Sequence, residues 1–182
     1  MMAMPTINLP PMTPARPEEI LLPPKPWFVA LTLLVALLMN LLPWSGVWLA
    51  LKPDFLALVL LYWCIQQPRW IGVGTAWAFG LLMDVGQGSL FGQHALAYAL
   101  LGFAAEYFHR RVLRFPLWQQ AAHVAVLLAL SMALVMLVRV AGGAAIADWS
   151  NFLGAVSGAL LWPPLSIILQ WPQRPPPSPG ER

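Results

Sequence analysis

The chain has 182 residues and a formal net charge of +3, and 59% of its residues are hydrophobic while only 9% are charged. A soluble domain carries about 25% charged residues, so this composition and a mean hydropathy of +0.69 exclude an ordinary soluble domain. The basic residues are few and scattered between apolar runs, which excludes a clustered nucleic-acid-binding surface. The composition predicts an integral membrane protein that forms one helix bundle.

Charged residues mark where the chain leaves the apolar layer, because a spanning helix needs about 20 apolar residues. We predict an all-α, polytopic membrane bundle of about six transmembrane helices, approximately at residues 27–42, 53–67, 70–84, 89–109, 116–139 and 149–171. The second and third are short and form either two short spans, with Arg69 reaching the interface, or a hairpin that enters the membrane and returns. Residues 1–26 and 172–182 are Pro-rich and are predicted to be disordered cytoplasmic tails.

The distribution of Lys and Arg predicts the orientation. With six spans and both termini in the cytoplasm, eight of the 10 basic residues lie on cytoplasmic segments, and only Lys52 and Arg139 lie outside. An excess of Lys and Arg in cytoplasmic segments is the usual signature of membrane topology. On the outer side, Arg139 is expected to pair with Asp84 or Asp148.

Small residues recur on one face of the third predicted helix. Gly72, Ala76, Gly80 and Asp84 follow one another in steps of four, which places them on one helix face. Small side chains let another helix approach closely, so this face should pack inward. Asp84 then lies at the outer end of a packed face, where a carboxylate is tolerated at the interface and against protein.

The segment after Asp84 is predicted to be a flexible outer connection. Its candidate functional residues are Gly88, Ser89, Gly92 and His94. Glycine permits the positive φ values that a tight reversal requires, and Ser89 is a candidate N-cap for the fourth helix.

Polar residues also mark a face of the fourth predicted helix, which carries His94, Tyr98, Gly102 and Glu106 in steps of four. Three interpretations remain open for this face. It can be a polar face turned toward the bundle, a contact with a partner helix, or a proton relay, because ionisable residues inside membranes are often functional.

The last predicted helix contains a GxxxG pattern at Gly154 and Gly158. This pattern is known from close helix association, but glycine is common in membrane helices. The two glycines can therefore serve packing within the chain or docking of another chain.

No catalytic or metal-binding constellation is apparent. Ser89 and His94 lie five residues apart, but no third orienting group and no nucleophile elbow accompanies them. His109 and His123 show no metal-ligand spacing with His94, and Cys64 is interpreted as a buried small residue. We predict no enzyme activity, no catalytic residue, no metal and no cofactor.

Six stretches of the chain together suggest a family. They are KPDFLALVLLYW from Lys52, PRWIGVG from Pro68, GLLMD from Gly80, GSLFGQH from Gly88, PLWQQ from Pro116 and LWP from Leu161. In order and spacing they resemble the rod shape-determining MreD family of Gram-negative bacteria, over about residues 27–170. Two features depart from the family pattern. The tails are Pro-rich, and at the second predicted helix this chain has Lys52-Pro-Asp where the family has Arg-Pro, often followed by Asn or Asp.

The resemblance implies a multi-pass protein of the bacterial inner membrane that belongs to the cell-elongation machinery. MreD-like proteins work with MreC, and through it with the actin-like MreB, the glycosyltransferase RodA and the elongation-specific penicillin-binding protein, in lateral peptidoglycan synthesis. The resemblance also implies a fold similar to the six-helix substrate-binding subunits of vitamin-uptake (ECF) transporters, and it transfers no active site.

Two functions are weighed on this basis. The first is a membrane scaffold that holds the transmembrane helix of MreC against the small-residue faces, Gly72/Ala76/Gly80 and Gly154/Gly158. The alternative is a small-molecule binding or transport subunit with a pocket near its outer mouth, lined by Asp84, Gln87, Gln93 and His94. The AxxxA-type face that vitamin-uptake subunits carry on their first helix is absent from this sequence.

Overall fold

Six α-helices follow one another in the computed structural model, which describes residues 24–46, 49, 51–144 and 152–173. They are α1 (Pro26–Leu41), α3 (Phe55–Gln66), α4 (Val73–Gln87), α5 (Gln93–Val112), α6 (Leu117–Ala141) and α7 (Leu153–Gln170), and the short 3-10 helix η2 (Trp171–Gln173) ends the described part. The prediction of an all-α chain with six helices is confirmed for these residues. The predicted tails lie almost entirely outside them.

Helix α3 forms the centre of the bundle. Every residue from Leu56 to Ile65 is buried, because α3 packs against α1, α5, α6 and α7. A helix that is apolar on all sides is stable only when it is surrounded in this way. Its 12 residues span about 18 Å, which is less than the roughly 30 Å of a bilayer core.

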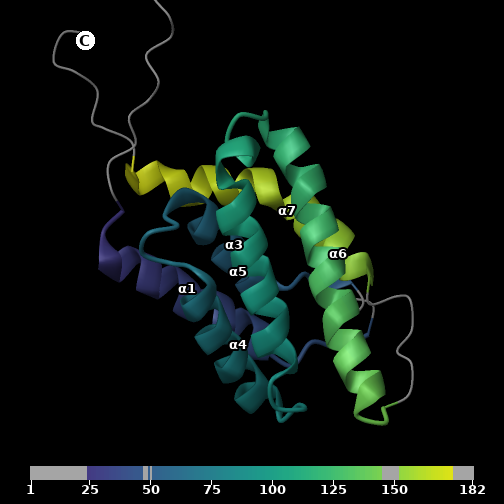
Figure 1. The fold of residues 1–182 in the computed structure, drawn as a ribbon. Helices are drawn as coiled ribbons and strands as arrows, with labels where there is room; N and C mark the ends of the chain where they lie inside the picture. Colours follow the sequence, from purple (N-terminus) through teal and green to yellow (C-terminus); the bar gives the residue numbers. More distant parts are fainter. Residues whose placement is uncertain (1–23, 47–48, 50, 145–151, 174–182) are drawn as a thin grey trace, which may run out of the picture.

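The other helices surround α3. Helix α5 lies between α4 and α6, and α7 crosses behind them at a marked tilt (Figure 1). Helix α4 packs mainly on α5, and α3 also contacts α5. The second and third predicted helices, which correspond to α3 and α4, therefore both lie against α5.

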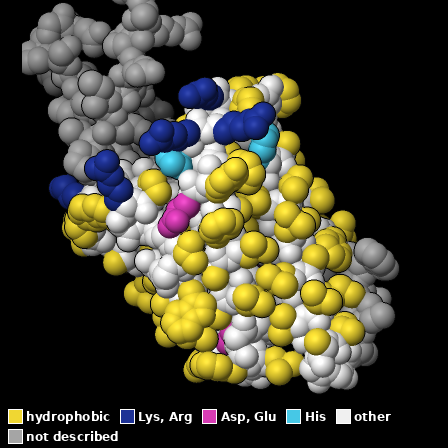
Figure 2. Space-filling view, viewed as in Figure 1, with side chains coloured by type: hydrophobic (Ala, Val, Ile, Leu, Met, Phe, Trp, Pro, Cys, Tyr) yellow, Lys and Arg dark blue, Asp and Glu magenta, His cyan; other side chains and the backbone are white. Residues whose placement is uncertain are grey.

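The surface of the bundle is apolar, as expected for helices in a membrane. Hydrophobic side chains cover most of the face shown in Figure 2, and large ones such as Leu160 and Trp171 are about three-quarters exposed, at 74% and 75%. Soluble proteins rarely expose apolar patches of this extent. Two segments, Leu117–Ala141 and Leu153–Gln173, are long and apolar enough to cross a membrane, and α1 and α3 are shorter apolar helices.

Charged side chains separate to the two ends of the bundle. The Lys and Arg side chains visible in Figure 2 gather at one end, which we name the basic end and define by Lys25, Arg69, Arg110, Arg111 and Arg114. Helix α1 starts there, α3 and α5 finish there, and α4 and α6 start there. The opposite end, named the polar end, holds Lys52, Asp54, Asp84, His94 and Arg139.

Two glycines shape the connection between α4 and α5 at the polar end. Gly88 closes α4 with a φ of 59°, and Gly92 precedes α5 with a φ of 99°. Both values lie in the left-handed region that favours glycine. Helix α5 begins at Gln93, so the prediction of Ser89 as its N-cap is wrong. The Ser89 hydroxyl contacts Asp84 instead.

Candidate functional site

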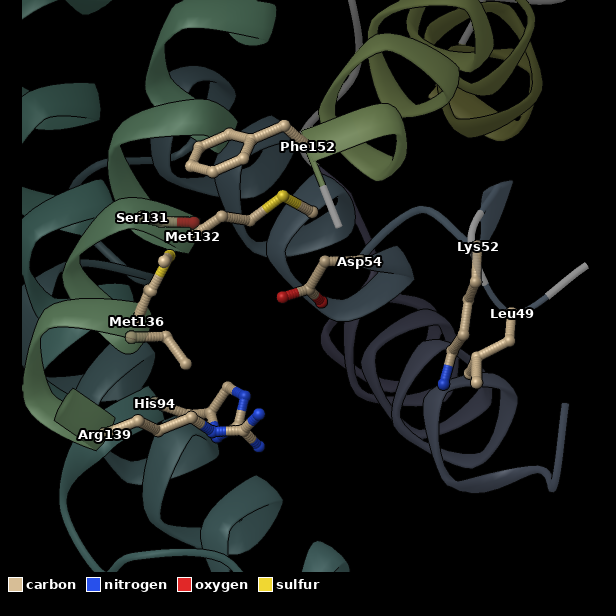
Figure 3. Close-up of a pocket in the computed structure, with 10 residues that line it drawn as sticks. Leu49, Lys52, Asp54, His94, Ser131, Met132, Met136, Arg139 and Phe152 are labelled. Carbon is tan, nitrogen blue, oxygen red and sulfur yellow. The ribbon is translucent and has the colours of Figure 1, made fainter. Parts of the chain in front are cut away.

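A cavity of about 190 Å³ opens at the polar end of the bundle, and we name it the polar cavity. Side chains from the segment before α3, the start of α5, the second half of α6 and the residue before α7 surround it (Figure 3). Its lining residues are Leu49, Lys52, Asp54, His94, Ser131, Met132, Val135, Met136, Arg139 and Phe152. Charged and apolar groups therefore share one small space.

Behind the cavity, the carboxylate of Asp84 accepts hydrogen bonds from several groups of the α4–α5 connection and the start of α5. Oδ1 accepts from the His94 backbone N–H at 3.0 Å, from His94 Nδ1 at 2.8 Å and from the Ser89 hydroxyl at 3.2 Å. Oδ2 accepts from the N–H of Gly92 at 2.8 Å and of Ala95 at 3.4 Å. The Asp84 side chain is fully buried, and it satisfies backbone groups at the start of α5 that have no helical partner.

The Asp84 carboxylate also fixes the ring of His94. Because Nδ1 donates to Asp84 at 2.8 Å, the opposite nitrogen, Nε2, remains for the polar cavity, which His94 lines beside Arg139 (Figure 3). A carboxylate that holds one ring nitrogen sets the tautomer and orientation of a histidine. The ring can therefore present Nε2 to a ligand as an acceptor, or as a donor when protonated.

Arg139 lies at the rim of the polar cavity, and its partner differs from the expectation. Its Nε donates to Oε1 of Gln93 at 3.2 Å, whereas Asp84 pairs with His94. The predicted pairing with Asp84 is therefore wrong, and Asp148 lies outside the described residues. The Gln93 contact leaves the terminal nitrogens of the guanidinium directed at the cavity region (Figure 3).

Asp54 forms a second hydrogen-bonded cluster that joins three helices. Its Oδ1 accepts from Asn40 Nδ2 on α1 at 2.6 Å and from the Ala57 N–H at 2.9 Å, and its Oδ2 accepts from the Tyr98 hydroxyl on α5 at 2.7 Å. Asn40 in turn accepts from the Phe55 N–H at 3.1 Å. Asp54 therefore caps α3 and ties it to its neighbours.

Sequence reasoning missed the Asp54 cluster, because charged residues in this region served only to mark where the chain leaves the apolar layer. One residue in the sequence did indicate a polar contact. Asn40 is a single amide in a long apolar run, and a polar side chain in that setting needs a hydrogen-bond partner. The identity of that partner is a three-dimensional property: Asp54 is 14 residues away and the third member, Tyr98, is 44 residues beyond Asp54.

Lys52 lies beside the Asp54 cluster, in the connection before α3. Its ammonium donates to the backbone carbonyl of Asn40 at 2.5 Å. Partial burial lowers the pKa of Lys52, and the neighbouring Asp54 carboxylate opposes this shift.

The predicted small-residue faces pack against other parts of the same chain. A Cβ at Gly80 would lie 2.6 Å from the Ala95 nitrogen, and one at Gly72 would collide with the Glu106 carboxylate. Cβ atoms at Gly154 and Gly158 would lie 2.6 Å from the Lys52 carbonyl oxygen and 2.7 Å from Leu128 Cδ1. Ala76, on the same face as Gly80, is buried as well.

Of the candidate residues of the fourth helix, His94 and Tyr98 have ring centroids 5.8 Å apart, but His94 and Glu106 are not brought together. His94 bonds Asp84 at the polar end, whereas Glu106 accepts the Val73 N–H at 3.1 Å near the basic end. Ser89 bonds Asp84 and not the His94 ring, so the two do not form a nucleophile–base pair. Among the described residues, no group of three or more His, Cys, Asp or Glu side chains lies close enough to hold a metal.

Comparison with known proteins gives a consistent result. Residues 25–171 match the family model described as rod shape-determining protein MreD. The chain is 31% identical over 145 residues to the rod shape-determining protein MreD of Haemophilus influenzae, covering 79% of this chain and 90% of that relative. No solved structure matches the chain. The chain therefore belongs to the MreD family of rod shape-determining proteins, which are non-enzymatic membrane proteins.

Proposed function

We propose that the chain is a scaffold of the cell-elongation complex in the bacterial inner membrane. It supports cell shape and lateral peptidoglycan synthesis by contacting MreC, and through MreC the filament protein MreB, RodA and the elongation-specific penicillin-binding protein. The observation that carries this proposal is the family match, which covers the whole helical bundle from residue 25 to 171.

The proposed orientation places the basic end in the cytoplasm. Support comes from the clustering of Lys25, Arg69, Arg110, Arg111 and Arg114 at that end, because Lys and Arg are enriched on the cytoplasmic side of membrane proteins. Both termini are then cytoplasmic, and the polar cavity opens on the outer side of the membrane.

The partner surface is proposed on α5. The small-residue faces are already occupied within the chain, so a helix of MreC needs another surface. Leu96, Leu100, Phe103 and Tyr107 form one exposed stripe along α5, with Phe103 60% and Tyr107 73% exposed. The Phe103 and Tyr107 rings stack with centroids 6.5 Å apart, and aromatic side chains are enriched at protein interfaces.

Replacing both aromatic residues tests this surface. We expect Phe103→Ala with Tyr107→Ala to lower co-purification of MreC from membranes. Yield and helical content should stay unchanged, because both side chains are exposed. Ile168→Ala, at an equally exposed position on α7 (62%), is the matched control. Equal recovery of MreC with the double variant and with the control would show that the α5 stripe is not the contact.

A second candidate function is favoured by the polar cavity. Its volume of about 190 Å³ is below the roughly 300–1,000 Å³ of drug-sized ligand sites, so it suits a small ligand or one polar group. The Asp54 carboxylate already accepts three hydrogen bonds from the chain itself. The terminal guanidinium nitrogens of Arg139 and Nε2 of His94 remain for a ligand in the cavity. The favoured ligand is a small anion. The similarity to vitamin-uptake subunits remains a prediction.

Native mass spectrometry of the gently purified chain tests the second candidate. We expect a small anion that is retained by the wild type to be lost from Arg139→Gln, because that variant removes the cation at the cavity rim. Arg69→Gln removes the same charge at the opposite end and should retain the ligand. A wild-type spectrum without any adduct favours the scaffold alone.

A further inference from the structure

An apolar groove of about 480 Å³ lies between α5 and α6 at the basic end. Phe108 and Val112 form the α5 side, Phe115 lies in the connection between the two helices, and Val126 and Leu130 form the α6 side. The α6 lining extends from residue 122 to residue 130, which corresponds to about 12 Å along a helix. The groove therefore runs along the bundle, from the basic end toward its apolar middle.

A cation stands at the end of this groove. Arg111 lines it, and Arg110 and Arg114 are exposed beside it. In the part of the chain that the structure describes, none of these three arginines forms an ion pair. His123 belongs to the wall, because its ring stacks on Phe115 with centroids 5.2 Å apart and its Nδ1 lies 2.8 Å from the Gln119 carbonyl oxygen.

We infer that the groove binds one anionic phospholipid, with an acyl chain along its apolar walls and the phosphate at Arg111. The order of the parts matches an amphiphile: apolar walls extend toward the membrane centre, and the cation lies at the end that faces water. A guanidinium binds phosphate oxygens through two parallel hydrogen bonds. Basic pockets between membrane helices recognise anionic headgroups on the same principle.

The lining favours a lipid chain over a helix of another protein. Its apolar walls end at the guanidinium of Arg111, which suits a chain that carries a charged headgroup at one end. A helix with its side chains is about 10 Å wide, whereas an acyl chain is thin and adapts to irregular walls. A free phosphate would use Arg111 and leave the apolar walls without a partner.

The test uses the full chain alone, in detergent, with equal amounts of phosphatidylglycerol and phosphatidylcholine. Native mass spectrometry should show one retained phosphatidylglycerol in preference to phosphatidylcholine. Arg111→Gln should lower this retention by about fivefold, in line with the ~1 kcal/mol that one basic residue contributes at an anionic membrane surface. Arg110→Gln is the matched control, since it removes the same charge from the neighbouring residue, which does not line the groove. That variant should retain the lipid.

A second variant tests the apolar part. Leu130→Trp should displace the lipid by filling the groove while Arg111 stays intact. Equal retention of both lipids, or equal loss in the two arginine variants, would overturn the inference in favour of diffuse charge attraction. Competition by inorganic phosphate at the same concentration would point to a free anion and would also overturn it. Unchanged lipid retention by Leu130→Trp, together with weaker co-purification of MreC with this variant from membranes, would identify a protein site instead.

Discussion

Replacing Gly80 by leucine is expected to destabilise the bundle by about 3 kcal/mol, the upper end of the usual cost of overpacking, because α4 and α5 pack too closely for a side chain there. A Cβ at this position would lie 2.6 Å from both the Ala95 nitrogen and the His94 carbonyl oxygen. These are backbone atoms, which cannot move without shifting the start of α5. The measurement is the midpoint of thermal unfolding of the purified chain in detergent, together with the yield of monodisperse protein.

Gly74→Leu is the matched control on the same helix. Position 74 is exposed, and a Cβ there would meet nothing within 4 Å. Glycine is about 0.8–1.0 kcal/mol less favourable than alanine in a helix, and leucine ranks next to alanine, so the unfolding midpoint of the control should be unchanged or slightly raised. Similar midpoints for Gly80→Leu and the wild type would contradict the close packing of α4 on α5.

Asp84→Ala is expected to cost about 3–5 kcal/mol, because it removes the acceptor of several buried donors at once. The carboxylate is fully buried and accepts from the N–H groups of Gly92, His94 and Ala95. Alanine would leave these donors without a partner, and each unsatisfied buried group costs about 1–3 kcal/mol. Hydrogen exchange should show faster opening of the α4–α5 connection.

Two further variants sharpen the Asp84 experiment. Asp84→Asn keeps one acceptor oxygen but loses the charge, so its unfolding midpoint should fall between those of the wild type and the alanine variant. Gln87→Ala changes an exposed residue one turn away and should leave exchange unaltered. If Asp84→Ala unfolded like Gln87→Ala, the proposed role of this carboxylate as the organiser of the connection would be lost.

The helices could be predicted from the sequence because the physical signal is local. A charged group inside hydrocarbon is costly, so charges mark segment ends, and each of the six predicted spans overlaps one observed helix. The four-residue recurrence of Gly72, Ala76 and Gly80 likewise indicated a packed face, since a helix repeats every 3.6 residues. Gly80 does lie against α5, at Ala95.

The polar contacts could not be predicted in the same way, because they join residues that no local pattern relates. Asp84 was placed correctly at the end of a helix face, but its role depends on donors supplied by residues 89–95, after a reversal at Gly88 and Gly92. Arg139 shows the limit of charge matching. Asp84 was one of its two expected partners, whereas the fold places the amide of Gln93 beside Arg139 and pairs Asp84 with His94.

The most direct test of the account is depletion of the chain from its host, followed by rescue and microscopy. As a member of the MreD family, the chain should be needed for rod shape, so depleted cells should widen and become round. Expression of the wild type or Gly74→Leu should restore rods, and Gly80→Leu should not, because its bundle does not pack. Depleted cells that keep the length and width of normal rods would contradict the proposed role.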